Sequence, residues 1–416
     1  MIKRKKINEL KSHLDKKEIF LLAGARQAGK TTLLRLVEAE LNQAGRKTLF
    51  LNLDIEADYG HFKSQDRLLQ KIKLEVGNDG FVFIDEIQRK ENAGLFLKGL
   101  YDQNLNYKFI VSGSGGLELK EKIHESLAGR KRMIELSTIS FEEFVNYRTD
   151  YRYETKLDDY FKTESEKTFL LLDEYLRFGG YPQVVLADRV EEKIKIINEI
   201  YQSYLEKDIR FLLDIRKTGP LTDLFRLMAG QAGNLINVSE LSSTLGISAA
   251  TVKNYLWYFE KTYIMKKVAP FHANMRKEIV KAPIYHFSDL GMKNFGAGDF
   301  GHIAPAREGR LFENFIHALL IEKLESSASG INFWRTKDGA EVDFIIKSGR
   351  KITPVEVKYS QLKKPDMTRS LHSFISAYEP DAAFVVNLSY TDRILVGKTT
   401  VWFVPFYELL FSGINF

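Results

Sequence analysis

The sequence predicts an α/β protein that opens with a parallel sheet covered by helices and continues into three further units. Between residues 19 and 139, short β-like runs alternate with helix-like runs, which is typical of a parallel sheet. The segment Gly-Ala-Arg-Gln-Ala-Gly-Lys-Thr, residues 24–31, directly follows the first β-like run and precedes an amphipathic stretch. With 416 residues, the chain is too long for one ordinary core, so we expect several domains.

The domain boundaries follow changes in pattern along the chain. Residues 1–140 contain the expected sheet, with strands at 19–23, 48–53, 81–85, 108–112 and 132–136. Residues 141–215 are rich in Tyr, Glu, Asp and Lys and predict a helical lid on that sheet. Residues 216–272 predict a winged helix-turn-helix, and residues 273–416 predict a unit with the order α-β-β-β-α-β.

The composition excludes several classes of protein. Hydrophobic residues make up 44% and charged residues 28%, as in globular proteins, and no apolar run approaches the roughly 20 residues that span a bilayer. The chain has no cysteine, so disulfide scaffolds, thiolate metal sites and cysteine nucleophiles are excluded. The start Met-Ile-Lys-Arg-Lys-Lys lacks the apolar core of a signal peptide, and we expect a cytoplasmic protein without membrane contact.

The net charge of +6 is mild, but the first 17 residues are strongly basic. Such a cluster can meet phosphates, or it can be a solvated arm that keeps the protein soluble. Both interpretations stay open at this point.

Residues 24–31 match the G-x-x-x-x-G-K-[ST] phosphate loop in its strand, loop and helix context. Its glycines let backbone N–H groups and the helix N-terminus point at a polyphosphate. Lys30 would reach the β- and γ-phosphates, and the Thr31 hydroxyl would ligate Mg²⁺, so we expect ATP and Mg²⁺ as cofactors. The loop residues expected to hold the nucleotide are Gly24, Ala25, Arg26, Gln27, Ala28, Gly29, Lys30, Thr31 and Thr32.

Polar residues end the next two central strands. Phe81 to Ile84 is apolar and leads into Asp85, which can share the Mg²⁺ with Thr31, and Glu86, which can polarise the attacking water. The alternative is an apolar strand that happens to end in acids. After the following strand, the hydroxyl of Ser114 would lie beside the γ-phosphate.

Arg130 follows that strand and precedes the last strand of the sheet. A guanidinium at this position can stabilise transition-state charge on the nucleotide of a neighbouring subunit. This role requires self-assembly into a homo-oligomer, with a ring as one form. The alternative is a surface salt bridge.

The third unit has the pattern of a helix-turn-helix. Residues 239–245 predict a first helix with a serine cap, 246–248 a turn, 249–261 a second helix and 264–268 a wing strand. Apolar positions would form its core and leave Thr251, Lys253 and Asn254 outward for a nucleic-acid groove. Winged helices also dock proteins, so that alternative stays open.

The sequence predicts that two carboxylates and a lysine lie close together in the last unit. Asp343 lies on one expected strand, and Glu356 and Lys358 share a face of the next, across a hairpin turn at 348–350. Asp343 and Glu356 could bind Mg²⁺ while Lys358 orients a water for phosphodiester attack, and Glu313 on the preceding helix could add a third ligand. The alternative is alternating charge on solvent-facing strands.

Together these segments resemble prokaryotic AAA+ ATPases with a C-terminal domain of unknown function. The likeness rests on residues 24–31, Asp85-Glu86, Gly113-Ser114, 126–130, 140–144, 175–182, 287–291, 311–314, 341–344 and 356–358. It implies that the last domain is similar to the PD-(D/E)xK nuclease superfamily, with Asp343, Glu356 and Lys358 on catalytic positions and Glu313 as its helix acid. It also implies that Tyr181 and Pro182 line the adenine pocket and that Arg130 is an arginine finger.

The leading expectation is an ATP-hydrolysing protein that processes nucleic acid, most simply DNA, with the nuclease-like domain driven by the ATPase. The second is an ATP-gated switch or scaffold whose nuclease-like domain binds DNA or protein without cutting. A small-molecule kinase would give the helix-turn-helix no use.

Overall fold

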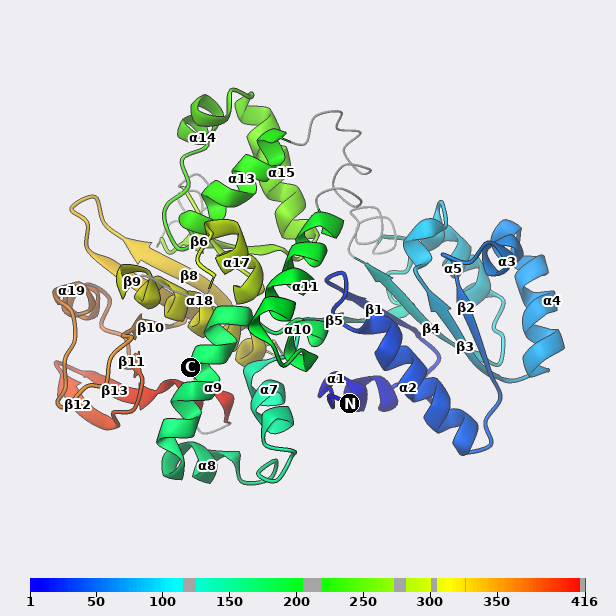
Figure 1. Cartoon of the computed structure of the whole chain (residues 1–416), viewed down its shortest axis with the longest axis horizontal. Coiled ribbons are helices and arrows are strands. Elements are labelled where there is room, and N and C mark those ends of the chain that lie inside the picture. Colours follow the sequence, from blue (N-terminus) through cyan, green and yellow to red (C-terminus); the bar gives the residue numbers. More distant parts are fainter. Residues whose placement is uncertain (115–124, 205–218, 273–281, 301–304, 326, 412–415) are drawn as a thin grey trace.

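The chain folds into two lobes, which lie side by side in Figure 1. This computed structural model describes residues 1–114, 125–204, 219–272, 282–300, 305–325, 327–411 and 416. The first lobe contains the N-terminal sheet, and the second contains the elements after residue 140. Within the described ranges, no helix has both the length and the apolar character that a membrane crossing requires.

A five-stranded parallel sheet in the order β2-β3-β4-β1-β5 forms the first lobe. The five expected strands are confirmed, each within two residues of its expected ends. The elements are α1 (Lys6–Lys11), β1 (Ile19–Gly24), α2 (Lys30–Gln43), β2 (Thr48–Asn52), α3 (Glu56–Tyr59), η1 (Gly60–Lys63), α4 (Gln65–Val76), β3 (Gly80–Asp85), η2 (Ile87–Arg89), α5 (Ala93–Asp102), β4 (Tyr107–Ser114) and β5 (Lys131–Leu136).

Both faces of the central strands of this sheet are buried, which explains why β1 and β3 are nearly continuous apolar runs. Phe20 and Leu22 pack in a cluster with apolar residues of α1 and α2. Ile19 and Leu21 alternate with them and pack in a cluster with residues of α4 and α5. Strand β1 lies between β4 and β5. The phosphate loop, which follows the C-terminal end of β1, is therefore flanked by the ends of both neighbouring strands.

The helices expected as a lid share their core with the C-terminal unit. Residues of α7–α9 cluster with residues of α18 (Pro305–Leu324) and of the C-terminal sheet. Figure 1 places these helices within the second lobe. They are α7 (Phe141–Arg148), α8 (Leu157–Thr163), α9 (Ser165–Phe178), α10 (Pro182–Leu186) and α11 (Val190–Gln202).

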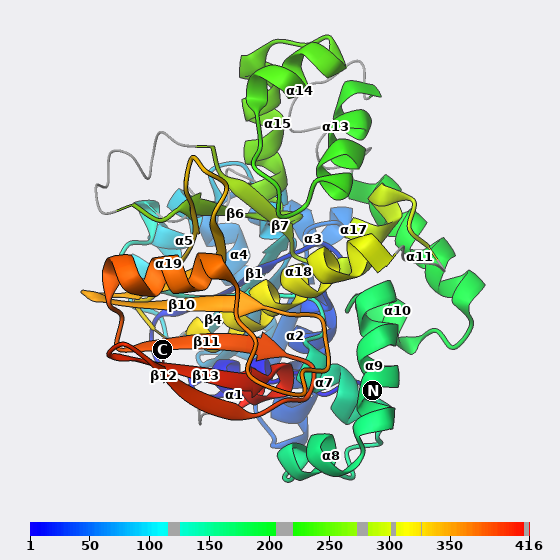
Figure 2. The same ribbon diagram turned by 90° about the vertical axis from the view of Figure 1, so that its left-hand side faces the viewer.

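Two helices lie where the sequence places a helix-turn-helix, and they project from the top of the second lobe in Figure 2. The side chain of Asn237, and not a serine, caps the first helix, because it accepts the N–H groups of Ser239 and Glu240. Ser248 caps the second helix. The elements are α13 (Gly219–Gly230), α14 (Val238–Leu245), α15 (Ala249–Lys261), β6 (Met265–Pro270) and β7 (Ile284–Phe287).

The C-terminal sheet has eight strands in the order β12-β13-β11-β10-β9-β8-β6-β7. The β6–β7 hairpin joins it where Ala269 pairs with Asn332 of β8, so the sheet continues across the expected boundary at residue 272. The order α-β-β-β-α-β is present from α18 to β11, and two strands follow. The elements are α17 (Leu290–Ala297), β8 (Gly330–Arg335), β9 (Glu341–Ser348), β10 (Lys351–Val357), α19 (Arg369–Tyr378), β11 (Ala382–Asn387), β12 (Asp392–Val396), β13 (Thr399–Pro405) and η4 (Phe406–Leu410).

A close backbone contact joins the end of α9 to the start of α17. The carboxylate of Asp289 accepts N–H bonds from Gly180 at 2.8 Å and from Met292 at 3.1 Å. A Cβ on Gly179 would lie 2.3 Å from Oδ1 of Asp289, and one on Gly180 would lie 2.1 Å from the Ile139 carbonyl oxygen. Glycine is therefore required at both positions, because a Cβ would clash with these atoms. Burial raises the pKa of Asp289 to about 6, although its hydrogen bonds oppose that shift.

Candidate functional site

The phosphate loop makes a tight turn at the C-terminal end of β1. Gly24 approaches β5 so closely that a Cβ would lie 2.2 Å from the Leu136 carbonyl oxygen. Gly29 precedes α2 with a φ of 94°, a left-handed conformation that favours glycine. Lys30 is buried, and its Nζ donates to the carbonyl oxygens of Gly24 at 3.1 Å and Ala25 at 2.8 Å. The lysine ammonium and the N-terminus of α2 therefore meet at one turn, which is the arrangement that binds polyphosphates.

Asp85 connects the loop to the neighbouring strands. The Thr31 hydroxyl donates to Oδ2 of Asp85 over 2.7 Å, as expected for two groups that share a metal. The buried hydroxyl of Ser112 on β4 donates to the other oxygen of Asp85. The sequence pattern did not indicate Ser112, although it lies in the same strand as the predicted Ser114. The side chain of Ser114 lies outside what the structure describes.

Glu86 occupies an uncommon backbone conformation at the tip of β3. Its φ of 57° lies in the left-handed region, which costs free energy for a residue other than glycine. The side-chain amide of Gln88 donates to Oε2 of Glu86, and the Glu86 N–H donates to Oδ1 of Asp85 over 3.1 Å. The turn thus holds the Glu86 backbone against the Asp85 carboxylate and the Glu86 carboxylate against Gln88, at the loop edge of the sheet.

The second lobe contacts the phosphate loop directly. The Tyr204 hydroxyl accepts the N–H of Arg26 over 2.7 Å. A Cβ on Gly29 would lie 3.7 Å from Cγ of Pro182, so Pro182 lies against the loop. Tyr181 is buried in the apolar cluster that contains Ala25 and Ala28. The two residues that the family likeness assigned to the adenine pocket therefore lie beside the loop, together with Tyr204, which the sequence did not indicate.

Arg130 lies at the opposite edge of the sheet. Its carbonyl oxygen accepts the N–H of Ile19 at the start of β1, over 2.9 Å. Six residues of extended strand, about 18–20 Å, separate that point from the loop end of β1 at Gly24. The Arg130 side chain is partly exposed, and its Nε contacts Oδ1 of Asp102 at 2.8 Å. A role for Arg130 at a nucleotide would therefore require another copy of the chain.

The carboxylates of the C-terminal sheet are held by the protein itself. Val355 of β10 pairs with Phe344 of β9, and the same register sets Glu356 beside Asp343. Oδ2 of Asp343 accepts the N–H of Val357 over 2.7 Å. Burial raises the pKa of Asp343 to about 7, and the Glu356 carboxylate contributes.

The Glu356 carboxylate also has hydrogen-bond and ion-pair partners within the domain. It is 5% exposed, and its Oε2 accepts the Thr368 hydroxyl over 2.6 Å. Nζ of Lys358 lies 3.6 Å from Oε1 of Glu356 and 2.5 Å from Oδ2 of Asp366, a residue that the sequence pattern did not indicate. The expected juxtaposition of Glu356 and Lys358 is present, and Asp366 competes for the lysine.

Glu313 lies behind this pair on α18. Burial, followed by the negative charge of Asp343, raises the pKa of the Glu313 carboxyl well above its usual value. Nε2 of His286 lies 3.7 Å from Oε1 of Glu313, and the buried His286 ring stacks on His317 at a centroid distance of 4.5 Å. Burial lowers the pKa of His286 to about 3, so it is neutral. Stacking inside the core gives His317 a structural role.

Among the described residues, no group of three or more His, Asp or Glu side chains is arranged to hold a metal ion. The charge of Glu356 raises the pKa of Asp343, and the charge of Asp343 raises that of Glu313, but within the described residues the three acids do not surround one ion position. At the phosphate loop, the protein contributes Thr31 and Asp85, and a nucleotide-bound Mg²⁺ would take its other ligands from phosphates and water.

On α15, Lys253 and Asn254 are exposed as expected. Thr251 is half-buried, and its hydroxyl lies 2.8 Å from the Ser248 hydroxyl, so it contributes mainly to the helix cap. Trp257 is 37% exposed one turn after Lys253, and Nζ of Lys261 lies 5.8 Å from the centroid of one of its rings. The exposed face of the helix is therefore basic and aromatic.

The basic N-terminal segment is largely neutralised by the chain's own acids. Its ion pairs are Lys3–Glu154, Arg4–Glu143, Lys5–Glu142, Lys5–Glu322, Lys6–Glu9, Lys6–Glu325 and Lys11–Glu40. The segment is therefore not a freely solvated arm, whereas contact with phosphates stays a prediction.

Comparisons with family models divide the chain into three parts. Residues 16–145 match an AAA domain, residues 170–300 a domain of unknown function (DUF8612), and residues 308–409 another domain of unknown function (DUF4143). An uncharacterised protein of Methanocaldococcus jannaschii is 26% identical over 93% of this chain and 85% of its own length. An uncharacterised protein of Mycobacterium tuberculosis is 26% identical over 88% and 75%.

Among solved structures, the chain is similar to the Aeropyrum pernix ORC1 protein in complex with DNA, with 13% identity, a TM-score of 0.32, and 71% of this chain and 91% of that one covered. AMPPCP-bound DnaA from Aquifex aeolicus gives 16% identity, a TM-score of 0.27, and coverage of 61% and 85%. The AAA match, the parallel sheet and the loop geometry together make residues 16–145 a P-loop AAA+ ATPase domain.

Proposed function

We propose that this protein hydrolyses ATP with Mg²⁺ and uses the resulting movement to process nucleic acid, with DNA as the polymer. The observation that carries the proposal is the 2.7 Å hydrogen bond between Thr31 and Asp85, at the mouth of a loop that also presents Lys30. In this arrangement Lys30 neutralises the β- and γ-phosphates, Thr31 and Asp85 hold Mg²⁺, and Glu86 polarises the attacking water. Tyr181 and Pro182 close the side of the loop that faces the second lobe.

DNA binding is assigned to the exposed face of α15. Lys253 and Asn254 would meet phosphates and base edges, while Thr251 supports the cap. Trp257, exposed beside them, adds a stacking surface. In Figure 2, α14 and α15 project from the top of the second lobe, and the side chains of Lys253, Asn254 and Trp257 are exposed on α15.

The C-terminal domain is proposed as nuclease-like, with Asp343 and Glu356 binding Mg²⁺, Lys358 orienting a water and Glu313 assisting. The order of elements from α18 to β11 and the neighbouring positions of Asp343 and Glu356 support this assignment. A metal would have to compete with the Thr368 hydroxyl at Glu356 and with the Val357 N–H at Asp343.

That competition favours a second function, an ATP-gated switch whose nuclease-like domain binds DNA or protein without cutting. Within the described ranges the acids do not gather around one ion position, and burial keeps the Asp343 carboxyl partly protonated near neutral pH. A switch needs the ATPase and the binding surface but no second metal site.

One experiment separates the two functions. ATP hydrolysis and the integrity of a DNA duplex are followed together with Mg²⁺ for the wild type, Lys30→Ala and Glu356→Ala. Lys63→Ala and Asp338→Ala, at exposed positions, serve as charge-matched controls. We expect Lys30→Ala to lose hydrolysis and Glu356→Ala to keep hydrolysis but lose cleavage. Bound but intact DNA in the wild type would favour the switch, and hydrolysis that ignores DNA, without DNA binding, would exclude the processing of DNA.

Self-assembly is tested separately. Arg130 is about six strand residues away from its own loop, so the proposed finger acts on a neighbouring subunit. Mixing Arg130→Ala subunits with Lys30→Ala subunits should restore part of the hydrolysis, because some interfaces then combine an intact loop with an intact finger. Unchanged, additive low activity in the mixture would show that Arg130 has only its structural pairing with Asp102.

A further inference from the structure

We propose that residues 2–6 form a coupling arm that carries the state of the nucleotide site to α18, with Arg4 as the residue that positions the phosphate loop. The inference rests on the proposed nucleotide binding at residues 24–31. The AAA match begins at residue 16, so these residues lie outside it. The arm is placed between the two lobes, where Figure 1 shows the N-terminus.

Arg4 joins the phosphate loop to the segment that leads into α7. Its side chain is 8% exposed, and its Nη1 donates to the carbonyl oxygen of Ala28 in the loop over 2.8 Å. Nη2 donates to the carbonyl oxygens of Ser137 at 2.7 Å and Thr138 at 3.3 Å. One planar guanidinium thus fixes the distance between the loop and the connection from β5 to α7.

Glu143 holds Arg4 in place. Its Oε2 contacts Nε of Arg4 at 3.1 Å, and its Oε1 accepts the backbone N–H of Lys5 over 2.7 Å. The same carboxylate accepts the Ser140 N–H in the capping box of α7. Arg4 is therefore oriented by the first turn of α7, and a shift of the phosphate loop is transmitted to that turn and to the arm.

The arm forms ion pairs at the C-terminal end of α18. Nζ of Lys5 lies 3.1 Å from Oε1 of Glu322, and Nζ of Lys6 lies 2.6 Å from Oε2 of Glu325. Ile2 is buried in the apolar cluster that includes α18 and the C-terminal sheet. The same helix carries Glu313 of the nuclease-like site two to three turns earlier.

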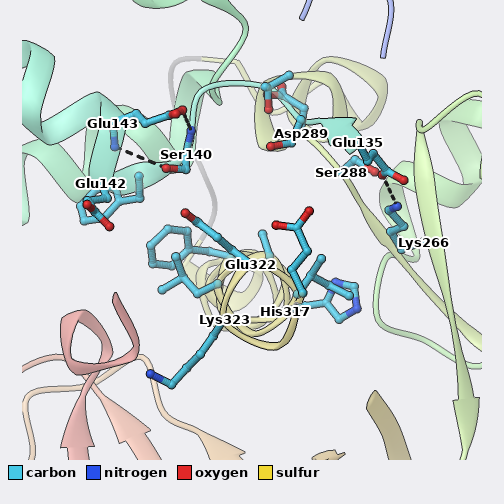
Figure 3. Close-up of a pocket in the computed structure, with 18 of the residues that line it drawn as sticks. Glu135, Ser140, Glu142, Glu143, Lys266, Ser288, Asp289, His317, Glu322 and Lys323 are labelled. Atoms are coloured by element: carbon cyan, nitrogen blue, oxygen red, sulfur yellow. Dashed lines mark hydrogen bonds and ion pairs between the residues drawn. The ribbon is translucent and has the colours of Figure 1, made fainter. Parts of the chain in front are cut away.

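A cavity of about 860 Å³ lies beside these contacts, lined by residues of both lobes. Figure 3 shows Glu322 on α18 directed into it, opposite Glu142 and Glu143 of α7. The cavity leaves room for α18 to shift relative to the sheet domain, while the arm bridges the two. Nucleotide binding at the loop would in this way change the position of α18 and of the acid that it carries.

The coupling is tested by hydrogen–deuterium exchange of the full-length protein with and without a non-hydrolysable ATP analogue and Mg²⁺. In the wild type we expect slower exchange at residues 24–34 and a nucleotide-dependent change at 316–324. In the double variant Lys5→Ala/Lys6→Ala the first response should remain and the second should fall by at least half. Lys11→Ala, whose partner Glu40 lies on α2, is the matched control and should keep both.

Arg4→Lys tests the positioning role, because it keeps the charge of the buried pair with Glu143 but cannot donate to all three segments. We expect at least a fivefold loss of analogue affinity, with an apparent melting temperature within a few degrees of the wild type. An α18 response that is equal in the double variant, or an unchanged affinity in Arg4→Lys, would overturn the proposal. No protection at residues 24–34 in the wild type would instead overturn nucleotide binding itself.

Discussion

The phosphate loop and the carboxylates of the C-terminal sheet are both predicted from short sequence patterns, but they differ in their hydrogen-bond partners in the structure. At the loop, Asp85 accepts a hydrogen bond from Thr31, the residue predicted to share Mg²⁺ with it, and Lys30 lies in the same turn. At the second site, the hydrogen-bond donors to Asp343 and Glu356 include the Val357 N–H and the Thr368 hydroxyl, which lie outside the predicted set of residues. A motif that is contiguous in sequence carries its own geometry, whereas residues brought together by strand pairing depend on everything packed around them.

The largest expected effect is on stability, when Gly24 at the start of the phosphate loop is replaced. A Cβ in Gly24→Ala would lie 2.2 Å from a backbone oxygen of β5, and neither strand can give way inside a buried sheet. We expect a loss of at least about 4 kcal/mol of unfolding free energy, measured by chemical denaturation. Gly349→Ala, in the β9–β10 hairpin with a φ of 61° and open space around it, should lose only roughly 1–2 kcal/mol. Equal losses would show that close approach is not what fixes Gly24.

The next effect concerns chemistry at the tip of β3. Glu86→Gln should reduce the rate constant of ATP hydrolysis roughly 100-fold or more, because the amide cannot polarise the attacking water. Nucleotide affinity, measured by titration with a fluorescent analogue, should stay within twofold. Glu356→Gln is the matched change at the other site and should leave hydrolysis unaltered. A Glu86→Gln protein that hydrolyses ATP normally would remove Glu86 from the proposed mechanism.

The sequence predicted the parallel sheet and the phosphate loop well because both depend on local pattern. Burial on both faces gives the central strands their apolar runs, and glycine spacing gives the loop its turn. It did not indicate Arg4, Ser112 or Tyr204, because each reaches the site through a contact that is distant in sequence. The sharing of one core between α7–α9 and the C-terminal unit was missed for the same reason, since an amphipathic helix does not specify which neighbour covers it.

The third prediction separates burial from function as the cause of a raised carboxylate pKa. Asp289 is buried like Asp343 but belongs to neither proposed site, and its pKa is about 6 instead of 3.8. The unfolded chain therefore releases this proton before the folded chain does as the pH rises. The contribution of Asp289 to stability is largest below pH 4 and falls by roughly 2 kcal/mol between pH 4 and pH 6.

The measurement is the difference in unfolding free energy between the wild type and Asp289→Asn across that pH range. Asparagine keeps the acceptor that caps α17 but does not titrate, so the wild type should lose ground to the variant as the pH rises. A difference that stays constant from pH 4 to pH 7 would mean that the hydrogen bonds from Gly180 and Met292 balance the burial. A raised pKa at Asp343 would then also need a cause other than burial.

The smallest effect probes how firmly the second site is held. The Thr368 hydroxyl donates to Glu356 and accepts the Leu371 N–H as the cap of α19. Thr368→Val should therefore lose about 1 kcal/mol of stability, while Thr368→Ser, which keeps the hydroxyl, should lose less than half of that. The change also frees Glu356 from a competing donor, so Mg²⁺ should raise the melting temperature of Thr368→Val more than that of the wild type. If Mg²⁺ stabilises neither protein beyond a Glu356→Ala control, the carboxylates of the C-terminal sheet do not form a metal site, and the switch becomes the better description of this domain.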